Sequence, residues 1–300
     1  MDKISRKKIT YRFSDENEAV LKVSSGAQIL FETLDAHSGT VPAGAIGEDV
    51  AFIDLNENNA NPITGLVCID GAEIGDTLAV KINRIDLVGT GFIPVRPKAG
   101  VVHDMAPEPL ARVIHIETNN WLLNSEWALP IRPMVGTIGT ALPGHGIAAM
   151  HPGDHGGNMD NNFVREGATV YLPVNVPGGL LGIGDVHAAM GDAEATGGGI
   201  DICADVFVEV NLVKKGALSR MPYIIIDNLF ILCGHGANIE MAIRSVTEEA
   251  IKVLSVQMRI SAREAYQLIS ALGDVNIAQA CNIPGLDVTT RLAIPMFWLK

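Results

Sequence analysis

Residues that can bind a metal ion are concentrated in one stretch of this 300-residue chain, between His151 and Asp201. Polar pairs recur there at a spacing of two residues: Asn158 and Asp160, Asp185 and His187, and Asp192 and Glu194. On an extended backbone, residues two apart point to the same face. Each pair is therefore predicted to aim both side chains into one cavity. Neighbouring glycines allow the backbones to approach closely there.

Carboxylates crowded in this way raise one another's pKa, and a divalent cation removes that repulsion. Oxygen from Asp, Glu and Asn together with imidazole nitrogen favours zinc, with calcium or magnesium as alternatives. Such a cation increases the acidity of a bound water and polarises a carbonyl. A further carboxylate could carry a proton from that water to a leaving nitrogen. The pattern therefore indicates metal-assisted hydrolysis.

Simpler interpretations compete with this one at every position. An Asp beside Gly is often a turn residue that binds its own backbone, and His187 alone could be a core histidine. His155 lies in a Gly/Pro-rich loop and could be exposed, whereas His235 could be a cap or loop residue as readily as a ligand. A non-catalytic β module that binds calcium remains an alternative, although His187 argues against it because calcium prefers oxygen. The sequence contains no nucleophile motif of a serine or cysteine hydrolase and no nucleotide-binding motif.

Composition narrows the class of partner. The net charge of −12 disfavours nucleic acids and anionic membranes, because binding to these depends on Lys and Arg. A small neutral or cationic ligand fits better. Four widely spaced cysteines without a CxxC motif are expected to pack as small apolar groups. We see no signal peptide or membrane-spanning segment, so a cytoplasmic location is expected.

The elements that must position these residues are mainly β. Short strand-like runs between Gly, Pro, Asn and Asp turns predict a sandwich or barrel up to about residue 235, followed by an α+β C-terminal portion. We predict a β-rich domain over 1–150 and an α+β domain over 151–300. Helices are expected over 239–256, capped by Asn238, and from Ser261 to Gly273, with a capping box to Glu264 and a stripe of Leu268, Ile269 and Leu272. The segment 90–109, which contains His103, is predicted to be a long ordered loop.

The chain resembles the acetamidase/formamidase family at several of these motifs. The central ones are Gly-Gly-Asn-Met-Asp at 156–160, Tyr-Leu-Pro-Val at 171–174, Gly-Asp-Val-His at 184–187 and Gly-Asp-Ala-Glu at 191–194. Upstream, Phe-Glu-Thr-Leu-Asp at 31–35 and Asn-Pro-Ile-Thr-Gly at 61–65 also match. The chain departs from the family pattern at Ala193, Asp201 and His37.

The resemblance implies an amidase that cleaves a small neutral linear amide to a carboxylate and ammonia, and a homodimer or larger homo-oligomer. It implies Asp35, Asp160, His187 and Asp192 as metal or metal-shell residues. It also implies Glu194 as the general base and places Asn158 in the site, with Asp185 orienting His187. A cyclic amide, such as a lactam, is the alternative substrate.

Overall fold

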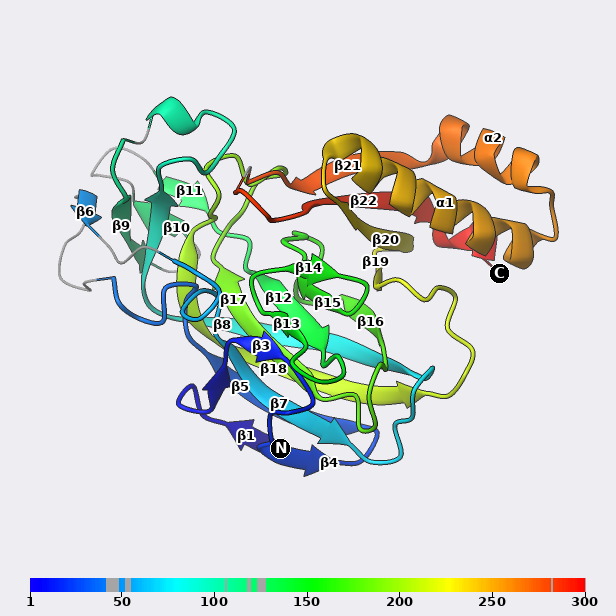
Figure 1. Cartoon of the computed structure of the whole chain (residues 1–300), viewed down its shortest axis with the longest axis horizontal. Helices are drawn as coiled ribbons and strands as arrows, with labels where there is room; N and C mark the ends of the chain where they lie inside the picture. The colour runs from blue at the N-terminus through cyan, green and yellow to red at the C-terminus, as the bar shows by residue number, and fades with distance from the viewer. Residues whose placement is uncertain are drawn as a thin grey trace.

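The computed structural model describes residues 1–41, 49–51, 55–105, 107–117, 120–122, 128–281 and 283–299. Its strands are, in chain order, β1 (Asp2–Ile4), β2 (Ile9–Thr10), β3 (Arg12–Phe13), β4 (Leu21–Val23), β5 (Ala27–Thr33), β6 (Asp49–Ala51), β7 (Ile63–Ile69), β8 (Thr77–Val95), β9 (Leu110–Glu117), β10 (Asn120–Leu122), β11 (Ala128–Pro130), β12 (Met134–Thr140), β13 (Ile147–Ala148), β14 (Pro152–Gly153), β15 (Gly156–Asn158), β16 (Thr169–Pro173), β17 (Leu181–His187), β18 (Asp201–Val213), β19 (Tyr223–Ile226), β20 (Leu229–Gly236), β21 (Asp274–Gln279) and β22 (Val288–Pro295). Within this described part, all strands except β3 and β13 belong to one curled, mainly antiparallel sheet (Figure 1). The predicted mainly β fold is confirmed.

The long antiparallel pair β8 and β18 runs through the middle of the sheet. β18 also pairs with β5, and β8 also pairs with β16 and β9. β17 pairs with both β7 and β12. Strands that precede residue 150 in the chain are therefore hydrogen-bonded to strands that follow it. The division into domains at residues 1–150 and 151–300 stays a prediction.

Alternation along β18 explains how the core forms. Ile202, Ala204, Val206, Val208 and Val210 are all buried, and the residues between them are partly exposed. Side chains two apart on a strand share one face, so this apolar face joins the main hydrophobic core. The sheet is therefore anchored on this core along most of β18.

Two helices, α1 (Ile239–Met258) and α2 (Ala262–Leu272), lie together over the C-terminal strands β20, β21 and β22 (Figure 1). Val246 and Leu254 of α1 pack against Phe230 and Leu292 of these strands. Asn238 caps α1 by accepting a hydrogen bond from the Met241 backbone at 2.9 Å. Neither helix combines the length and apolar character that a membrane crossing requires, and the described residues contain no other candidate.

The second predicted helix is confirmed with its capping box, in which Ser261 and Glu264 bind each other's backbone N–H groups. Its predicted apolar stripe is wrong at one end, because Leu272 is 58% exposed. Ile269 is buried as predicted and Leu268 is partly buried, and Ala265, which the stripe did not include, is buried with them. The buried residues of α2 belong to one cluster with Val253 and Leu254 of α1, a tertiary contact that local spacing does not reveal.

Two further predictions are corrected by the strands. β8 continues to Val95, so the connection that contains His103 is shorter than the predicted segment 90–109, in which Ala106 lies outside the described residues. That connection carries a short 3₁₀ turn, His103–Met105. His235 is neither a cap nor a loop residue, since it pairs with Thr289 within β20 and β22.

Candidate functional site

Three ligand-type side chains meet at one end of β17. Asp160, Asp185 and His187 each offer a ligand atom, and these atoms all lie within 4.8 Å of one another. All three residues are at most 2% exposed. Asp185 and His187 belong to β17, whereas Asp160 follows β15, and β12 pairs with both of these strands. The sheet therefore brings together two of the three pairs that the sequence singled out.

The backbone at these positions departs from a regular strand. Asp160 has φ of 44° and Asp185 has φ of 52°, which is the left-handed region that non-glycine residues rarely adopt. Such conformations cost about 1–3 kcal/mol each and concentrate at functional sites, where the surrounding structure enforces them. The two pairs converge, but local turns contribute to this as well as the simple alternation expected from spacing.

Gly136 of β12 makes room for the two carboxylates. A Cβ atom at this position would lie 2.5 Å from Asp160 Oδ1 and 2.9 Å from Asp185 Oδ2. It would also lie 2.8 Å from the Asp185 backbone oxygen. Real Cβ atoms essentially never approach so closely. The absence of a side chain at Gly136 is therefore a condition for placing Asp160 and Asp185 side by side.

Amide side chains hold one oxygen of each aspartate. Asn158 donates to Asp160 Oδ2 at 2.7 Å, and Asn61 donates to Asp185 Oδ2 at 2.8 Å. Asn61 and Thr137 in turn donate to Asn158 Oδ1 at 2.9 and 2.6 Å. The other oxygens, Asp160 Oδ1 and Asp185 Oδ1, are buried and accept no well-aligned hydrogen bond from the described residues, although His187 Nε2 lies 3.3 Å from Asp185 Oδ1.

Those two oxygens are the strongest sign that a cation fits here. A buried carboxylate oxygen that lacks a donor is costly, and a divalent cation bound between them would remove the cost. Burial, together with the charges of Glu194 and Asp185, raises the pKa of Asp160 well above its usual value. The residues that are present, two carboxylates and an imidazole, match the donors that zinc accepts.

His187 lies between two carboxylates. Its Nε2 atom is 3.3 Å from Asp185 Oδ1 and 3.2 Å from Asp201 Oδ1. Burial opposes a charge on the imidazole, yet the two carboxylates raise its pKa well above the usual value. Burial would also raise the pKa of Asp201, but His187 and His37 lower it to about 2. The same negative potential that favours a proton on His187 would favour a metal cation.

His37 and Asp201, two of the positions that depart from the family pattern, thus lie in or beside the site. His37 Nδ1 is 3.6 Å from Asp201 Oδ2, and both side chains are almost fully buried. Asp201 begins β18 directly opposite His187 in the strand register. The sequence identified both residues as unusual but did not reveal that they contact each other.

Glu194 reaches the site from the connection between β17 and β18. It is 6% exposed, and its Oε2 atom accepts a hydrogen bond from Cys281 Sγ at 2.8 Å. Burial raises the pKa of Glu194 to about 7, while the charge of His187 and the Cys281 hydrogen bond oppose the shift. A carboxylate with a pKa near neutrality can both accept and release a proton.

The third predicted pair diverges instead of sharing a cavity. Ala193 and Glu194 both have left-handed φ angles, 72° and 47°, and this turn sends Asp192 outward. The Asp192 carboxylate is 41% exposed and forms two hydrogen bonds with Arg291, at 2.9 and 2.6 Å. It therefore lies outside the group formed by Asp160 and its neighbours.

Asp35 lies beside the site as a turn residue. Its Oδ1 atom accepts backbone N–H groups from His37 at 2.9 Å and Gly39 at 3.0 Å. Burial raises its pKa, and the charge of Asp201 adds to the shift. Asp35 thus fixes the turn that presents His37, and it is not one of the three clustered ligand-type residues.

Other residues enter the site without a sequence signal. Gln279 donates to Asp160 Oδ2 at 3.3 Å, and Cys281 contacts Glu194. Gln279 is the last residue of β21 and Cys281 follows it by two residues, more than 80 residues beyond Glu194 along the chain. The expectation that Cys281 packs as an apolar group is wrong, since its thiol donates to a carboxylate. Asn61 lay within a recognised motif, whereas nothing distinguished Thr137, Gln279 or Cys281.

Three further histidines, whose roles the sequence did not decide, lie away from the candidate metal ligands. His155 is buried against Phe13, with ring centroids 5.0 Å apart, and burial lowers its pKa to about 4. His235 lies between Asp287 and Asp154, at 2.8 and 3.3 Å. His103 is found at the rim of an outer pocket. None of these three belongs to the group of Asp160, Asp185 and His187.

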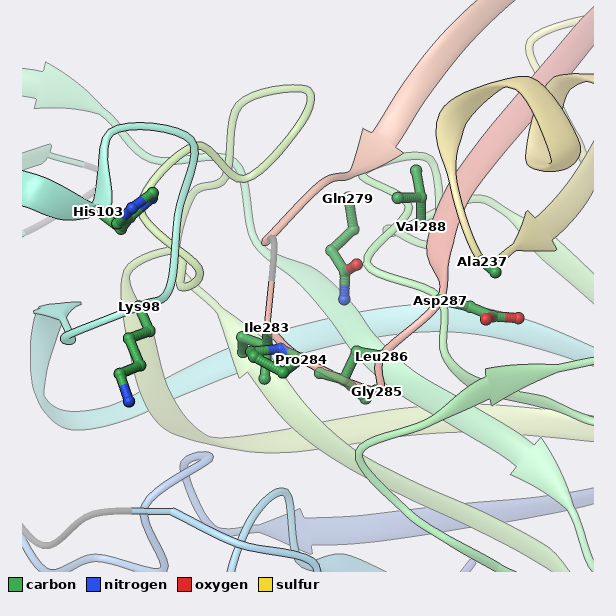
Figure 2. Close-up of a pocket in the computed structure, with 10 residues that line it drawn as sticks. All are labelled: Lys98, His103, Ala237, Gln279, Ile283, Pro284, Gly285, Leu286, Asp287 and Val288. Atoms are coloured by element: carbon green, nitrogen blue, oxygen red, sulfur yellow. The ribbon is translucent and has the colours of Figure 1, made fainter.

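A small cavity of about 30 Å³ lies against Asp185, His187 and Glu194. This is room for one or two small groups, because one water requires about 10–15 Å³ on this scale. A larger pocket of about 460 Å³ shares three wall residues with it, Gln279, Ile283 and Leu286. Figure 2 shows these three residues in the middle of the outer pocket, between Lys98 and His103 on one side and Asp287 on the other. The outer pocket thus adjoins the inner cavity.

Comparison with known proteins agrees with the motifs of the sequence. A model of the Acetamidase/Formamidase family matches residues 2–149 and 140–298. The chain belongs to the acetamidase/formamidase family. An acetamidase structure from Bacillus halodurans has 31% sequence identity and a TM-score of 0.92, covering 99% of this chain and 98% of its own. The predicted family resemblance is therefore confirmed over nearly the whole chain.

Two curated relatives match over smaller shares of their length. The acetamidase of Mycolicibacterium smegmatis is 34% identical, and the match covers 68% of this chain and 66% of that protein. The formamidase of Methylophilus methylotrophus is 40% identical over 72 residues, covering 24% of this chain and 18% of that protein. The matches to these relatives thus span from about a fifth to just under two thirds of their length.

Proposed function

We propose that this chain hydrolyses a small, neutral, linear amide to a carboxylate and ammonia, with a divalent cation held by Asp160, Asp185 and His187. The observation that carries the proposal is the buried group of ligand-type atoms within 4.8 Å, in which two carboxylate oxygens lack a donor. Membership of a family named for two amidases supports the reaction type.

Zinc is the cation that we favour. Its catalytic sites combine His nitrogen and Asp or Glu oxygen and commonly use three protein ligands. Calcium prefers an all-oxygen shell, and His187 departs from that preference. Asp35 and Asp192 are left out of the proposed ligand set, since backbone N–H groups and Arg291 already bind their carboxylates.

When bound, the cation would polarise the amide carbonyl and increase the acidity of a water molecule. We propose Glu194 as the general base, which removes a proton from the attacking water and delivers it to the leaving nitrogen. Cys281 occupies Oε2, which leaves Oε1 to carry that proton. Burial of Glu194 keeps its proton affinity high enough for the task.

The amide side chains have a positioning role in this proposal. Asn158 and Asn61 bind Oδ2 of Asp160 and Asp185, so that Oδ1 of each carboxylate is left for the cation. The same Oδ1 of Asp185 lies 3.3 Å from His187 Nε2, so it orients the imidazole before the cation binds, and both atoms would be ligands once it is bound. Interactions of this kind around a metal ligand typically change metal affinity by about 10–100-fold.

The size and charge of the site suit a small uncharged substrate. The inner cavity of about 30 Å³ fits a reacting amide group with little attached to it. The acidic chain, at −12, disfavours anionic substrates. Formamide and acetamide are thus the first substrates to test, and a lactam tests whether the outer pocket admits a ring.

The test joins metal analysis to an ammonia assay. Purified protein should contain a stoichiometric divalent metal and release ammonia from formamide or acetamide. A chelator should abolish this activity. Asp160→Asn should lose both metal and activity, while Asp70→Asn, which removes an exposed carboxylate paired with Lys22, should retain both. Full activity in the chelated protein or in Asp160→Asn would refute the proposal.

A calcium-binding module would give a different result. Chelation would then lower the melting temperature, and no amide in the panel would release ammonia at any metal content. We also propose a homodimer or larger homo-oligomer, as the family resemblance implies. Size-exclusion chromatography with light scattering measures this, and a mass near 31.9 kDa would contradict it.

A further inference from the structure

A second pocket lies beside the connection that carries Glu194. It has a volume of about 380 Å³, and the described part of its wall includes three arginines, Arg132, Arg165 and Arg291, but a single carboxylate, that of Asp192. A positive pocket is unexpected on a chain of net charge −12. We propose that this arginine pocket binds a small multivalent oxyanion, such as a phosphate or a polycarboxylate.

The pocket has a rigid base. Arg291 is only 5% exposed, and both of its terminal nitrogens bind Asp192. Its guanidinium carbon lies 4.9 Å from the centre of the Phe163 ring, and that of Arg165 lies 5.2 Å from the same ring. A shared aromatic ring orients both planar groups, so less conformational entropy is lost when a ligand binds.

The charges in the pocket are incompletely balanced. Asp192 neutralises Arg291, and Arg165 pairs with Asp227 at 3.0 Å. Arg132 is exposed and forms no ion pair with the described residues. The three arginines and two carboxylates leave an excess of one positive charge. An oxyanion between Arg132 and Arg165 would offset it, since guanidinium groups bind phosphate and carboxylate oxygens in a two-pronged geometry. Asn162, also at the wall, donates to Asp192 Oδ1 at 2.8 Å and helps to fix that carboxylate against Arg291.

This pocket is separate from the proposed metal site. Among the described residues, the two cavities have no wall residue in common. They are nevertheless close along the chain, because Asp192 is two residues from Glu194 and Asn162 is two residues from Asp160. A ligand in the arginine pocket would therefore bind at a separate site while contacting the segments that carry Glu194 and Asp160.

Calorimetric titration of the metal-loaded protein with inorganic phosphate, at constant ionic strength set by KCl, tests the proposal. Wild-type protein should bind one phosphate per chain in a saturable way. Arg132→Gln and Arg165→Gln should each weaken binding by about tenfold or more, as expected for losing a charge-assisted hydrogen bond. Arg244→Gln removes the same charge from the exposed face of α1 and should leave binding unchanged.

Two results would overturn the proposal. One is the lack of saturable binding of either phosphate or citrate to wild-type protein below about 10 mM, far weaker than a specific site requires. The other is binding that Arg132→Gln and Arg165→Gln leave unchanged, which would place the anion elsewhere, including at the metal. Citrate in place of phosphate distinguishes carboxylate from phosphate ligands, and the tighter of the two defines the class. Arg132 is exposed, so its variant keeps the test available if Arg165→Gln fails to fold.

Discussion

Gly136→Ala tests the geometry of the metal site with a single methyl group. The added Cβ would lie 2.5, 2.8 and 2.9 Å from Asp160 Oδ1, the Asp185 backbone oxygen and Asp185 Oδ2. All three distances are below the 3.0 Å that real Cβ atoms respect, so Asp160 Oδ1 must move by at least about 0.5 Å. Metal–ligand distances tolerate only about 0.2 Å, and the methyl group cannot be accommodated without disturbing both carboxylates.

We expect Gly136→Ala to lower metal affinity by about 10–100-fold, similar to disturbing the support of a ligand. Ammonia release at limiting metal should fall with it. Overpacking should also cost about 1–3 kcal/mol of stability, which chemical denaturation measures. Metal affinity is obtained by competition with a chromophoric chelator. Gly216→Ala is the matched control, because its Cβ would meet nothing closer than 3.4 Å.

A Gly136→Ala protein that binds metal and releases ammonia as the wild type does would contradict this prediction. That result would mean that Asp160 and Asp185 do not need to lie side by side. Loss of stability alone, with metal affinity unchanged, would have the same meaning, since it would separate the packing role of Gly136 from the proposed site.

Three further predictions address individual side chains. Glu194→Gln should retain metal and fold but lower turnover by about 100-fold or more, as expected for a general base, and wild-type turnover would remove Glu194 from that role. Asp192→Asn should retain stoichiometric metal but lose about 1–3 kcal/mol of stability, because the buried Arg291 loses its partner at a partly exposed pair; loss of metal from the folded variant would place Asp192 among the ligands. His155 has its pKa lowered from 6.5 to about 4, so the unfolded chain binds the proton more tightly, and stability should fall by up to about 3 kcal/mol between pH 6.5 and 4. Denaturation of His155→Gln should show a shallower pH dependence over this window, and equal slopes in both proteins would contradict the assignment.

Local signals in the sequence predicted the local structure well. The cap of Asn238 and the capping box of Ser261 act within one helical turn, so short-range spacing determines both. The exposure of Leu272 was not predictable in this way, because burial along α2 depends on its tertiary contact with α1. Similarly, β8 continues through glycines and a proline that locally indicate a loop, since pairing with β18 and β9 outweighs those local preferences.

The candidate site was likewise predicted only where local spacing determines it. Spacing placed Asp185 beside His187, and pairing of β12 with β15 and β17 brought Asp160 to them. The identical spacing failed for Asp192, because left-handed backbone at Ala193 and Glu194 turns the two carboxylates apart. The contacts of Gln279 and Cys281 depend on a strand from the far end of the chain. Contacts of that range are set by topology and cannot be derived from local spacing.

The central claim is that one divalent cation is bound by Asp160, Asp185 and His187. Diffraction from crystals of metal-loaded protein, measured on both sides of the absorption edge of the metal, locates the ion directly. The account predicts one anomalous peak within bonding distance of a carboxylate oxygen of each aspartate and of the His187 imidazole. A peak bound elsewhere, or a fully active protein without a peak at these residues, would contradict it.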